Sequence, residues 1–257
     1  MDRLGVWSIS GCIKPDQGFE TPDNEARIWR YSDLAKFVRM LDTKKLFFAS
    51  AKALTDVYEG TLTRPSLQQA VLLYTREHDV KPERIFGLIA KIPAQMLGVN
   101  CWHLNDNESP AMWQMYARDH QGIAIQSTFD RLSRSFQSYE THVYIGKVRY
   151  IDYNKATIDP RDVKQWMLHK RLEFAHENEL RAVTSLKDHN SLGIEVPCDL
   201  STLIERIYIA PVAPDYQIDV VRAVCKRFDF PVEIAPSDLD KPTPLVALMT
   251  GRDDPLA

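Results

Sequence analysis

The stretch HKRLEFAHENELRAV, residues 169–183, gathers acidic and basic side chains that could do chemistry together. Glu177, Glu179 and Arg181 stand at alternate positions, and alternate residues of an extended strand project from one face, about 6.5 to 7 Å apart. Two carboxylates at that separation raise each other's pKa, whereas a nearby cation lowers it. Such a trio can hold one carboxylate as a base or electrostatic stabiliser while the other orients an attacking group.

The same spacing also fits a solvated ladder of charges, in which Arg181 offsets two glutamates and adds little stability. Structural ion-pair networks look like active sites in this respect, so the stretch alone favours the ladder. Two further features bear on the choice. Helical spacing places Lys170 on one face with Glu177, and a loop at residues 52–62 carries Asp56 and Glu59. Loop acids either brace a turn or serve a site.

The composition is that of an ordinary soluble globular protein, with 257 residues, of which 44% are hydrophobic and 26% charged. A net charge of −3 gives no general attraction to nucleic acid. Cys12, Cys101, Cys198 and Cys225 lie far apart, which indicates reduced structural thiols rather than a metal or redox site. No run is long and apolar enough for a membrane helix, and the start does not read as a signal peptide, so we expect a cytoplasmic location.

Phosphate-binding loops are absent from the sequence. The chain has only 10 glycines, with no P-loop and no GxGxxG after a predicted strand. A nucleotide, if the protein uses one, is therefore held in neither the Walker nor the Rossmann manner.

The periodicity of apolar residues predicts elements of both kinds. A strand at residues 27–32 precedes a helix that Ser32 would cap, and Leu34, Phe37, Val38 and Leu41 form its core-facing stripe. Further strands are predicted at residues 45–50, 98–105, 122–129, 144–153, 179–186, 192–198, 204–211 and 232–236. Further helices are predicted at about residues 66–78, 83–92, 108–122, 129–137, 160–176 and 215–228.

Several of these strands are adjacent and the helices interrupt them irregularly. This order indicates an α+β fold with a mixed or largely antiparallel sheet and flanking helices. No repeat or linker divides the chain. We expect an N-terminal arm at residues 1–26, a single domain at 27–240 and a C-terminal tail at 241–257.

Three stretches together resemble a widespread bacterial family, catalogued as domain of unknown function 2971, over about residues 28 to 238. They are WRYSDL…LDTKKLFFASAKALTDVYEG, CWHLNDNESPAMWQMYARDHQGIAI and HKRLEFAHENELRAV. The positions that match the family's motifs are Met112, Trp113, Tyr116, Ala117, His120, Gly122, Glu177, Glu179 and Arg181. The chain departs from the family in the loop at 54–59, which keeps the acids but lacks an Asn and a Pro, and at His103, where the family has Ser.

The order of polar residues is also similar to that of many ADP-ribosyltransferases. Those enzymes place an Arg or His on an early strand, a Ser, Thr or aromatic residue on a middle strand, and Glu-x-Glu on a later strand. Here Arg30 is followed by residues 101–103 or 126–128, and then by Glu177 and Glu179. The likeness implies an ADP-ribosyltransferase-like fold and an enzyme that consumes NAD as co-substrate. Such an enzyme needs no Gly-rich loop to bind the dinucleotide.

The likeness also implies a role for each residue. Glu179 would stabilise the oxocarbenium-like cation formed as the nicotinamide–ribose bond breaks, and Glu177 would orient the attacking group. Arg30, beside Tyr31, would clamp the diphosphate, and Trp102 or Tyr116 would stack on the nicotinamide. The other site candidates are Asp56, Glu59, His103, Lys170 and Arg181.

The partner implied is a small-molecule nucleotide, with no membrane and no metal. The acceptor of the ADP-ribose is left open between protein, nucleic acid and water, the last giving an NAD glycohydrolase. The sequence does not indicate the oligomeric state. The company that the family keeps suggests a bacterial toxin or an antiphage-defence effector.

Two other functions fit the same residues. A Mg²⁺-dependent phosphodiesterase or nuclease would hold its metal with Asp56, Glu59, Glu177 and Glu179, and would place Lys170 near the scissile phosphate. A ligand-sensing or interaction module would use the fold without catalysis.

Structural roles compete with the functional ones at single positions. Arg30 could pair with a loop acid, and Trp113 and Tyr116 have the spacing of residues that pack a helix on a sheet. His120 near a helix C-terminus would be favourable there as a cation.

Overall fold

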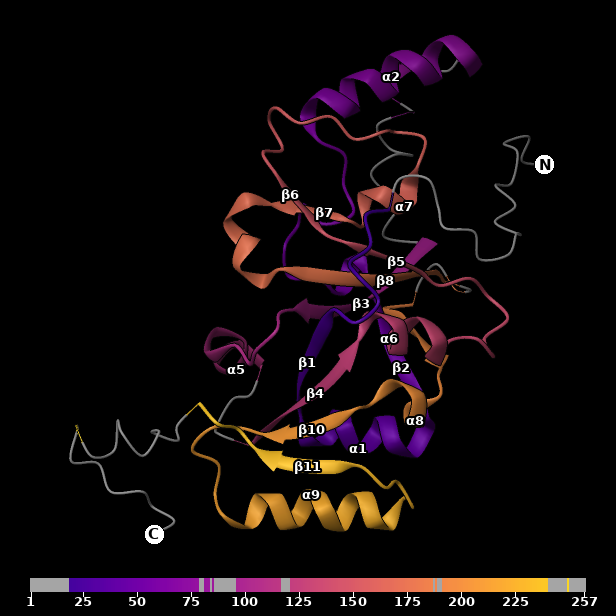
Figure 1. The fold of residues 1–257 in the computed structure, drawn as a ribbon. Helices are drawn as coiled ribbons and strands as arrows, with labels where there is room; N and C mark the ends of the chain where they lie inside the picture. Colours follow the sequence, from indigo (N-terminus) through magenta and orange to yellow (C-terminus); the bar gives the residue numbers. More distant parts are fainter. Residues whose placement is uncertain are drawn as a thin grey trace.

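The computed structural model describes residues 19–78, 81–83, 85, 96–116, 121–186, 188, 191–239 and 249. A nine-stranded sheet forms the body of this described part (Figure 1). Its main path runs through β11 (Glu233–Pro236), β10 (Arg206–Ile209), β4 (Gly122–Thr128), β1 (Arg27–Asp33), β3 (Leu97–Leu104), β2 (Lys45–Ser50) and β9 (Gly193–Pro197). β8 (Glu179–Ser185) pairs with β3, and β5 (Tyr144–Lys147) pairs with β8.

The strand pairs of this sheet are antiparallel, except that β10 and β11 run parallel. A parallel pair, β6 (Arg149–Ile151) and β7 (His169–Arg171), forms a second small sheet. This confirms the predicted α+β class with a largely antiparallel sheet. The predicted arm at 1–26 and tail at 241–257 fall largely outside the described residues, so the domain boundaries stay a prediction.

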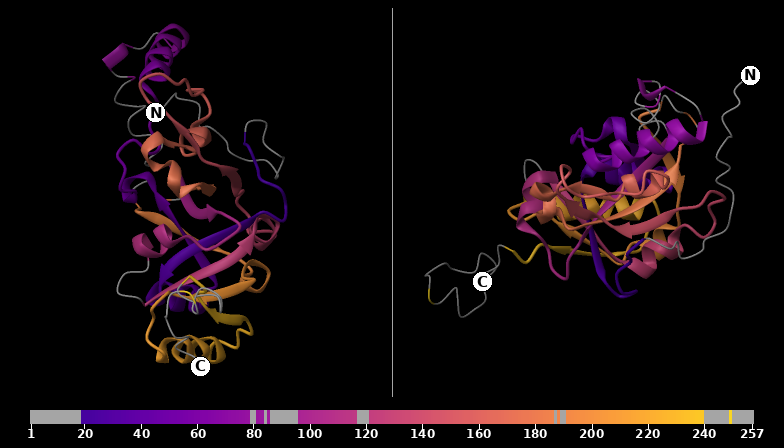
Figure 2. Two further views of the ribbon diagram at one scale, coloured as in Figure 1. Left: turned by 60° about the vertical axis from the view of Figure 1, so that its left-hand side comes forward. Right: turned by 90° about the horizontal axis from the view of Figure 1, so that it is seen from above.

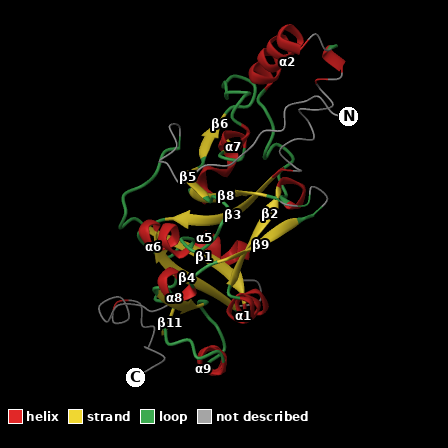
Figure 3. Cartoon of the chain, turned by 90° about the vertical axis from the view of Figure 1, so that its right-hand side faces the viewer, coloured by secondary structure: helices red, strands yellow, loops and turns green. Residues whose placement is uncertain are grey.

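Helices flank the sheet rather than alternate with every strand (Figures 1 and 2). They are α1 (Leu34–Thr43), α2 (Arg64–His78), α5 (Pro110–Tyr116), α6 (Phe129–Ser135), α7 (Val163–Trp166), α8 (Leu200–Leu203) and α9 (Tyr216–Arg227). Two 3₁₀ helices, η1 (Ala51–Ala53) and η3 (Leu172–Glu177), join strands to their neighbours. Figure 3 shows α2 and α9 at opposite ends of the molecule. None of the described helices is long and apolar enough to cross a membrane.

The first three elements follow the predicted pattern closely. Alternation in β1 sends Ile28 into the main core and Trp29 and Tyr31 into a second cluster with Trp113. The predicted cap is wrong by one residue, because Ser32 continues the ladder opposite Ile123. The side chain of the next residue, Asp33, caps α1 instead by accepting a hydrogen bond from a first-turn backbone N–H.

A fork opens in the sheet along one edge of β3. β8 pairs with the whole of the other edge, from Leu97 to His103. On the forked edge, β1 pairs only at His103 and Leu104, and β2 pairs only at Gly98 and Val99. Residues 100–102 therefore face a gap between β1 and β2, which run parallel to each other and diverge. Backbone groups that would be satisfied by a ladder elsewhere must find side chains or a ligand here.

The predicted helix at 160–176 is wrong, and it is the largest error in the sequence-based assignment. Only the four residues of α7 are α-helical, and Lys170 lies in β7, followed by η3. The helical pattern predicted that Leu172 would be buried. In the structure Leu172 is 55% exposed, and Lys170 is buried among acids that are distant in the sequence. Tertiary ion pairing overrides the local pattern at this point.

The chain is not extended at Glu177, so this residue does not share a strand face with Glu179 and Arg181 as their alternate spacing suggested. It ends η3, and Asn178 follows in the left-handed conformation, with φ of 37°, before β8 begins at Glu179. The Asn178 side chain donates to the carbonyl of Leu104, and its own carbonyl accepts from the Leu104 N–H, which fixes this turn on β3. The two glutamates meet because of the turn and not because of strand alternation. The predicted strand at 144–153 is also broken, at Val148, between β5 and β6.

Candidate active site

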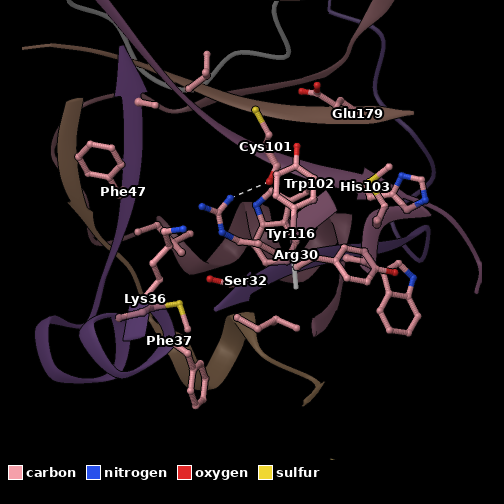
Figure 4. Close-up of a pocket in the computed structure, with 18 of the residues that line it drawn as sticks. Arg30, Ser32, Lys36, Phe37, Phe47, Cys101, Trp102, His103, Tyr116 and Glu179 are labelled. Atoms are coloured by element: carbon pink, nitrogen blue, oxygen red, sulfur yellow. Dashed lines mark hydrogen bonds between the residues drawn. The ribbon is translucent and has the colours of Figure 1, made fainter. Parts of the chain in front are cut away.

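A cavity of about 430 Å³ occupies the fork between β1 and β2 (Figure 4). Side chains from β1, α1, β2, β3, α5, η3, β8 and β9 line it. The predicted site residues among them are Arg30, Tyr31, Trp102, His103, Tyr116, Glu177 and Glu179. The cavity thus brings together both predicted catalytic residues and all four predicted cofactor-binding residues, from positions as far apart as 30 and 179.

Arg30 reaches into the fork from the middle of β1. Its Nη1 donates to the carbonyl oxygen of Cys101 at 2.8 Å, which satisfies one of the backbone groups that the fork leaves open. Its guanidinium also lies 6.0 Å from the ring centroid of Trp102. The guanidinium forms no ion pair within the described part of the chain, so the predicted structural alternative, a pair with Asp56 or Glu59, is wrong. Burial lowers the pKa of Arg30, as expected for a charge without a counter-ion.

Glu177 and Glu179 share one ammonium group. Lys170 Nζ lies 2.5 Å from Glu177 Oε2 and 2.9 Å from Glu179 Oε1, with all three side chains buried. Glu179 is held further by Arg181 Nε, at 2.6 Å from its Oε2. Its backbone N–H donates to the hydroxyl of Tyr150 at 2.8 Å. The two carboxyl groups therefore line one cavity, and Lys170 and Arg181 hold them in place.

The two carboxyl groups have opposite proton affinities. Burial, together with the neighbouring Glu179, raises the pKa of Glu177 to about 7 against the opposing effect of Lys170. Burial also opposes ionisation of Glu179, but Arg181 and Lys170 outweigh it and hold the pKa of Glu179 well below its usual range. Environments that separate two carboxyl pKa values in this way assign an acid/base role to one group and a permanent charge to the other.

Behind these acids lies a layer that does not reach the cavity. Arg181 is 1% exposed and also donates to Glu59 and to the carbonyl of Met167, the latter at 2.8 Å. Glu59 Oε1 also lies 3.6 Å from Lys170 Nζ. Asp56 pairs with Arg171 at 3.1 Å. The solvated ladder weighed against catalysis is thus absent, since Glu177, Glu179 and Arg181 are all buried.

The aromatic candidates differ in what a ligand can reach. Trp102 is 1% exposed, belongs to the main core and donates from Nε1 to Asn100 Oδ1 at 2.8 Å. Tyr31 is also buried, and its hydroxyl accepts from the Ser109 N–H. Tyr116, by contrast, is 51% exposed and ends α5 at the cavity. Of the three aromatic candidates, Tyr116 is the one best placed to stack on a ligand.

His103 joins β3 to the glutamate turn. Its Nδ1 lies 2.6 Å from the carbonyl oxygen of Glu177, and burial lowers its pKa, so the neutral ring donates from Nδ1. Its Nε2 has no hydrogen-bond partner among the described residues. His120 and Ala117, two other motif positions, lie outside the described residues.

The Mg²⁺ arrangement does not match this geometry. The four acids proposed as ligands are already bound to arginine or lysine, and the centre of the three that cluster is occupied by the Lys170 ammonium. In the described residues, no group of three His, Cys, Asp or Glu side chains is arranged to hold a metal ion.

Sequence reasoning missed the far end of the cavity, where Lys36, Arg39, Lys45 and Phe47 lie. Figure 4 shows Phe47 and Lys36 on the opposite side of the cavity from His103. The available signal was alternation in KLFFAS, which sends Leu46 and Phe48 to the core and leaves Phe47 48% exposed. Cys101 was also missed as a cavity residue. Burial raises the pKa of its thiol to about 12, which makes it a poor nucleophile.

Comparisons with known proteins bear on family and fold. The model of a family described as a protein of unknown function, DUF2971, matches residues 112–182, which confirms the resemblance predicted from the sequence. No curated protein matches. Among solved structures, DarT of Thermus sp. 2.9 in complex with NAD⁺ aligns at 10% identity and a TM-score of 0.41, covering 84% of this chain and 97% of that chain. The same protein in complex with ADP-ribosylated ssDNA aligns at 11% identity and a TM-score of 0.40, covering 85% and 97%. Similarity of this degree assigns neither ligand nor activity to the chain.

Proposed function

We propose that the protein transfers ADP-ribose from NAD to an acceptor, releasing nicotinamide. The observation that carries the proposal is a single cavity that presents, at one place, an arginine with no counter-ion among the described residues and, at another, an ionised glutamate. An unpaired guanidinium in a partly buried site favours an anionic ligand. A buried carboxylate favours a group that becomes cationic during reaction. NAD has both, a diphosphate and an anomeric carbon that becomes oxocarbenium-like.

Four cavity residues have a role in the proposed reaction. Arg30 binds the diphosphate through the donors that Cys101 does not use. Tyr116 stacks on the nicotinamide, and the ribose lies against Glu179. As the C–N bond breaks, its electron pair leaves with nicotinamide, and the ionised Glu179 stabilises the positive charge on the ribosyl group.

Glu177 serves the acceptor. A carboxyl group with a pKa of about 7 can take the proton from an attacking hydroxyl or amide at neutral pH. The acceptor oxygen or nitrogen then bonds to the anomeric carbon, and the proton leaves through Glu177. With water as the acceptor, the same steps give an NAD glycohydrolase.

Two observations favour this function over the alternatives. Lys170 occupies the position that a metal-dependent nuclease would need for Mg²⁺. A purely structural ion-pair network does not need its carboxyl groups to line a cavity, whereas Glu177 and Glu179 both line this one. The proposal includes a biological role as a bacterial toxin or an antiphage-defence effector, in which the acceptor of ADP-ribose is a protein or a nucleic acid.

The direct test is incubation of the protein with millimolar NAD, followed by chromatography of free nicotinamide. We expect release by the native protein and at least about a 100-fold slower release by Glu179→Gln, the loss typical of a removed charge-stabilising group. The matched control is Glu20→Gln, which removes an exposed carboxylate paired with Lys147. No nicotinamide release and no thermal shift with NAD would overturn the proposal.

A further inference from the structure

Glu59 lies behind the proposed reaction site and contacts both of its buried cations. It stands in the loop between η1 and α2, accepts a hydrogen bond from Arg181 Nη2, and places Oε1 3.6 Å from Lys170 Nζ. Its side chain is 3% exposed and does not line the cavity. Any effect of Glu59 on a bound ligand therefore passes through Lys170 and Arg181.

The buried cluster has more acids than bases. Glu59, Glu177 and Glu179 are three carboxylates, and they share the two cations Lys170 and Arg181. The neighbouring pair of Asp56 and Arg171 is balanced by itself. An uncompensated charge in a buried site is costly, so a cluster with one carboxylate in excess binds a proton at higher pH. Without Glu59, two carboxylates would face two cations.

The groups that face Glu177 leave the excess proton to the carboxylates. These groups are Lys170 from β7, Glu179 from β8, His103 from β3, Tyr116 from α5 and Tyr150 from β6, and His176 precedes Glu177 in η3. Burial raises the pKa of both tyrosines and lowers that of His103, so these three are neutral at pH 7. His176 is exposed.

We propose that Glu59 is a positioning residue for this site, which holds Lys170 and Arg181 beneath the cavity and makes Glu177 the group that exchanges a proton with the acceptor. Glu59 fills a donor of Arg181 and competes with Glu177 and Glu179 for Lys170, and so holds both cations in the layer behind the cavity. It also weakens the ion pair between the Lys170 ammonium and the Glu177 carboxylate. The part that concerns the acceptor rests on the proposed function, and the part that concerns protonation does not.

The protonation part is tested by stability, without NAD. A carboxyl group whose folded-state pKa lies above its unfolded value stabilises the protein below the unfolded pKa, and this contribution is lost as pH rises through the folded pKa. We therefore expect the melting temperature of the wild type to fall, relative to Glu177→Gln, between about pH 5 and pH 7. In Glu59→Gln this fall should be smaller, and in Glu59→Asp, which keeps the charge, it should return.

A carboxyl ¹³C NMR titration of the wild type supplies a second measurement that does not depend on how variants fold. We expect the carboxyl group that titrates near pH 7 to be that of Glu177. The proposal fails if Glu177 shows no titration near pH 7, or if the melting temperature of Glu59→Gln has the same pH dependence as that of the wild type.

The acceptor part is tested by the pH profile of nicotinamide release. In Glu59→Gln, the apparent pKa of kcat should move down by about one pH unit or more, while KM for NAD changes less than about twofold. A merely structural role would instead raise KM and lower kcat without moving the profile. The control is Glu77→Gln, which removes an exposed carboxylate held by Arg161 at 2.6 Å.

The two proposals fail in distinguishable ways. If the wild type releases no nicotinamide but the stability and NMR results are as expected, the function is wrong and the role of Glu59 in protonation stands. If the wild type is active and the profile of Glu59→Gln is unchanged, the role of Glu59 is wrong and the function stands.

Discussion

Replacing Arg30 by methionine separates a binding arginine from a structural one, because the first role predicts little change in stability and the second a large loss. The variant keeps the length of the side chain and its apolar stem, and it removes a partly buried charge that has no counter-ion in the described part of the chain. It also removes one hydrogen bond to the Cys101 carbonyl, which faces the cavity and can bind water instead. Loss of the hydrogen bond and relief of the unpaired charge oppose each other, so we expect a net change in unfolding free energy within about 1 kcal/mol. For a chain of this size that is a shift of no more than about 4 °C in Tm.

Ligand binding should respond far more strongly. Two charge-assisted hydrogen bonds to a diphosphate contribute about 1.5 to 3 kcal/mol each. Their loss, at least about 3 kcal/mol, corresponds to roughly 100-fold weaker binding or more. Calorimetric titration with NAD in a Glu179→Gln background, where turnover is suppressed, gives the affinity with and without the Arg30 substitution. Arg30→Lys should recover only part of the loss, because an ammonium lacks the planar fork of donors.

A structural arginine would behave in the opposite way. If Arg30 were instead held by a buried ion pair, breaking that pair would cost about 3 to 5 kcal/mol and would lower Tm by roughly 6 to 20 °C. The reasoning is refuted if Arg30→Met unfolds in that range, or if it binds NAD as tightly as its parent.

Three further predictions follow from the cluster and the turn. Glu179→Gln should bind NAD within about tenfold of the wild type but lower the Tm, because Arg181 loses one of its two carboxylate partners in a buried site at a cost of about 3 kcal/mol or more; calorimetry and thermal unfolding measure the two effects. The rate of nicotinamide release should rise with pH through an apparent pKa of about 7, and it should become independent of pH in Glu177→Gln. Proton loss from Glu177 should also lower the unfolding free energy of the wild type by on the order of 2 to 3 kcal/mol between about pH 4.5 and 7, which denaturant titration measures. Asn178→Gly should keep most of the release activity because glycine accepts a φ of 37°, whereas Asn178→Val should lose about 2 kcal/mol of stability and most activity; an unchanged Asn178→Val would contradict the importance of the turn.

Local pattern was sufficient for much of the fold. β1, α1 and β2 follow from alternation and from one amphipathic stripe, because each of these elements buries its own apolar face. The segment that carries Lys170 was missed because its conformation depends on partners that are distant in the sequence. Lys170 is buried only because Glu59, over a hundred positions earlier, and the glutamate turn offer it three carboxylates.

The candidate site shows the same division. The order of Arg30, His103 and the two glutamates along the chain was visible, and the cavity brings these residues together. Their electrostatic roles could not be predicted from the sequence, because residue spacing does not show which carboxylate pairs with Arg181. Asp56 and Glu59 were placed at the site as candidates by their motif, yet neither lines the cavity. They act as counter-ions behind it, a role that the sequence alone cannot distinguish from metal binding.

A crystal structure of Glu179→Gln grown with NAD tests the central claim most directly. The account predicts the dinucleotide in the fork between β1 and β2, with its diphosphate on Arg30 and its nicotinamide ribose against residues 177 and 179. An empty fork at saturating NAD, or a dinucleotide bound there with its diphosphate away from Arg30, would contradict it.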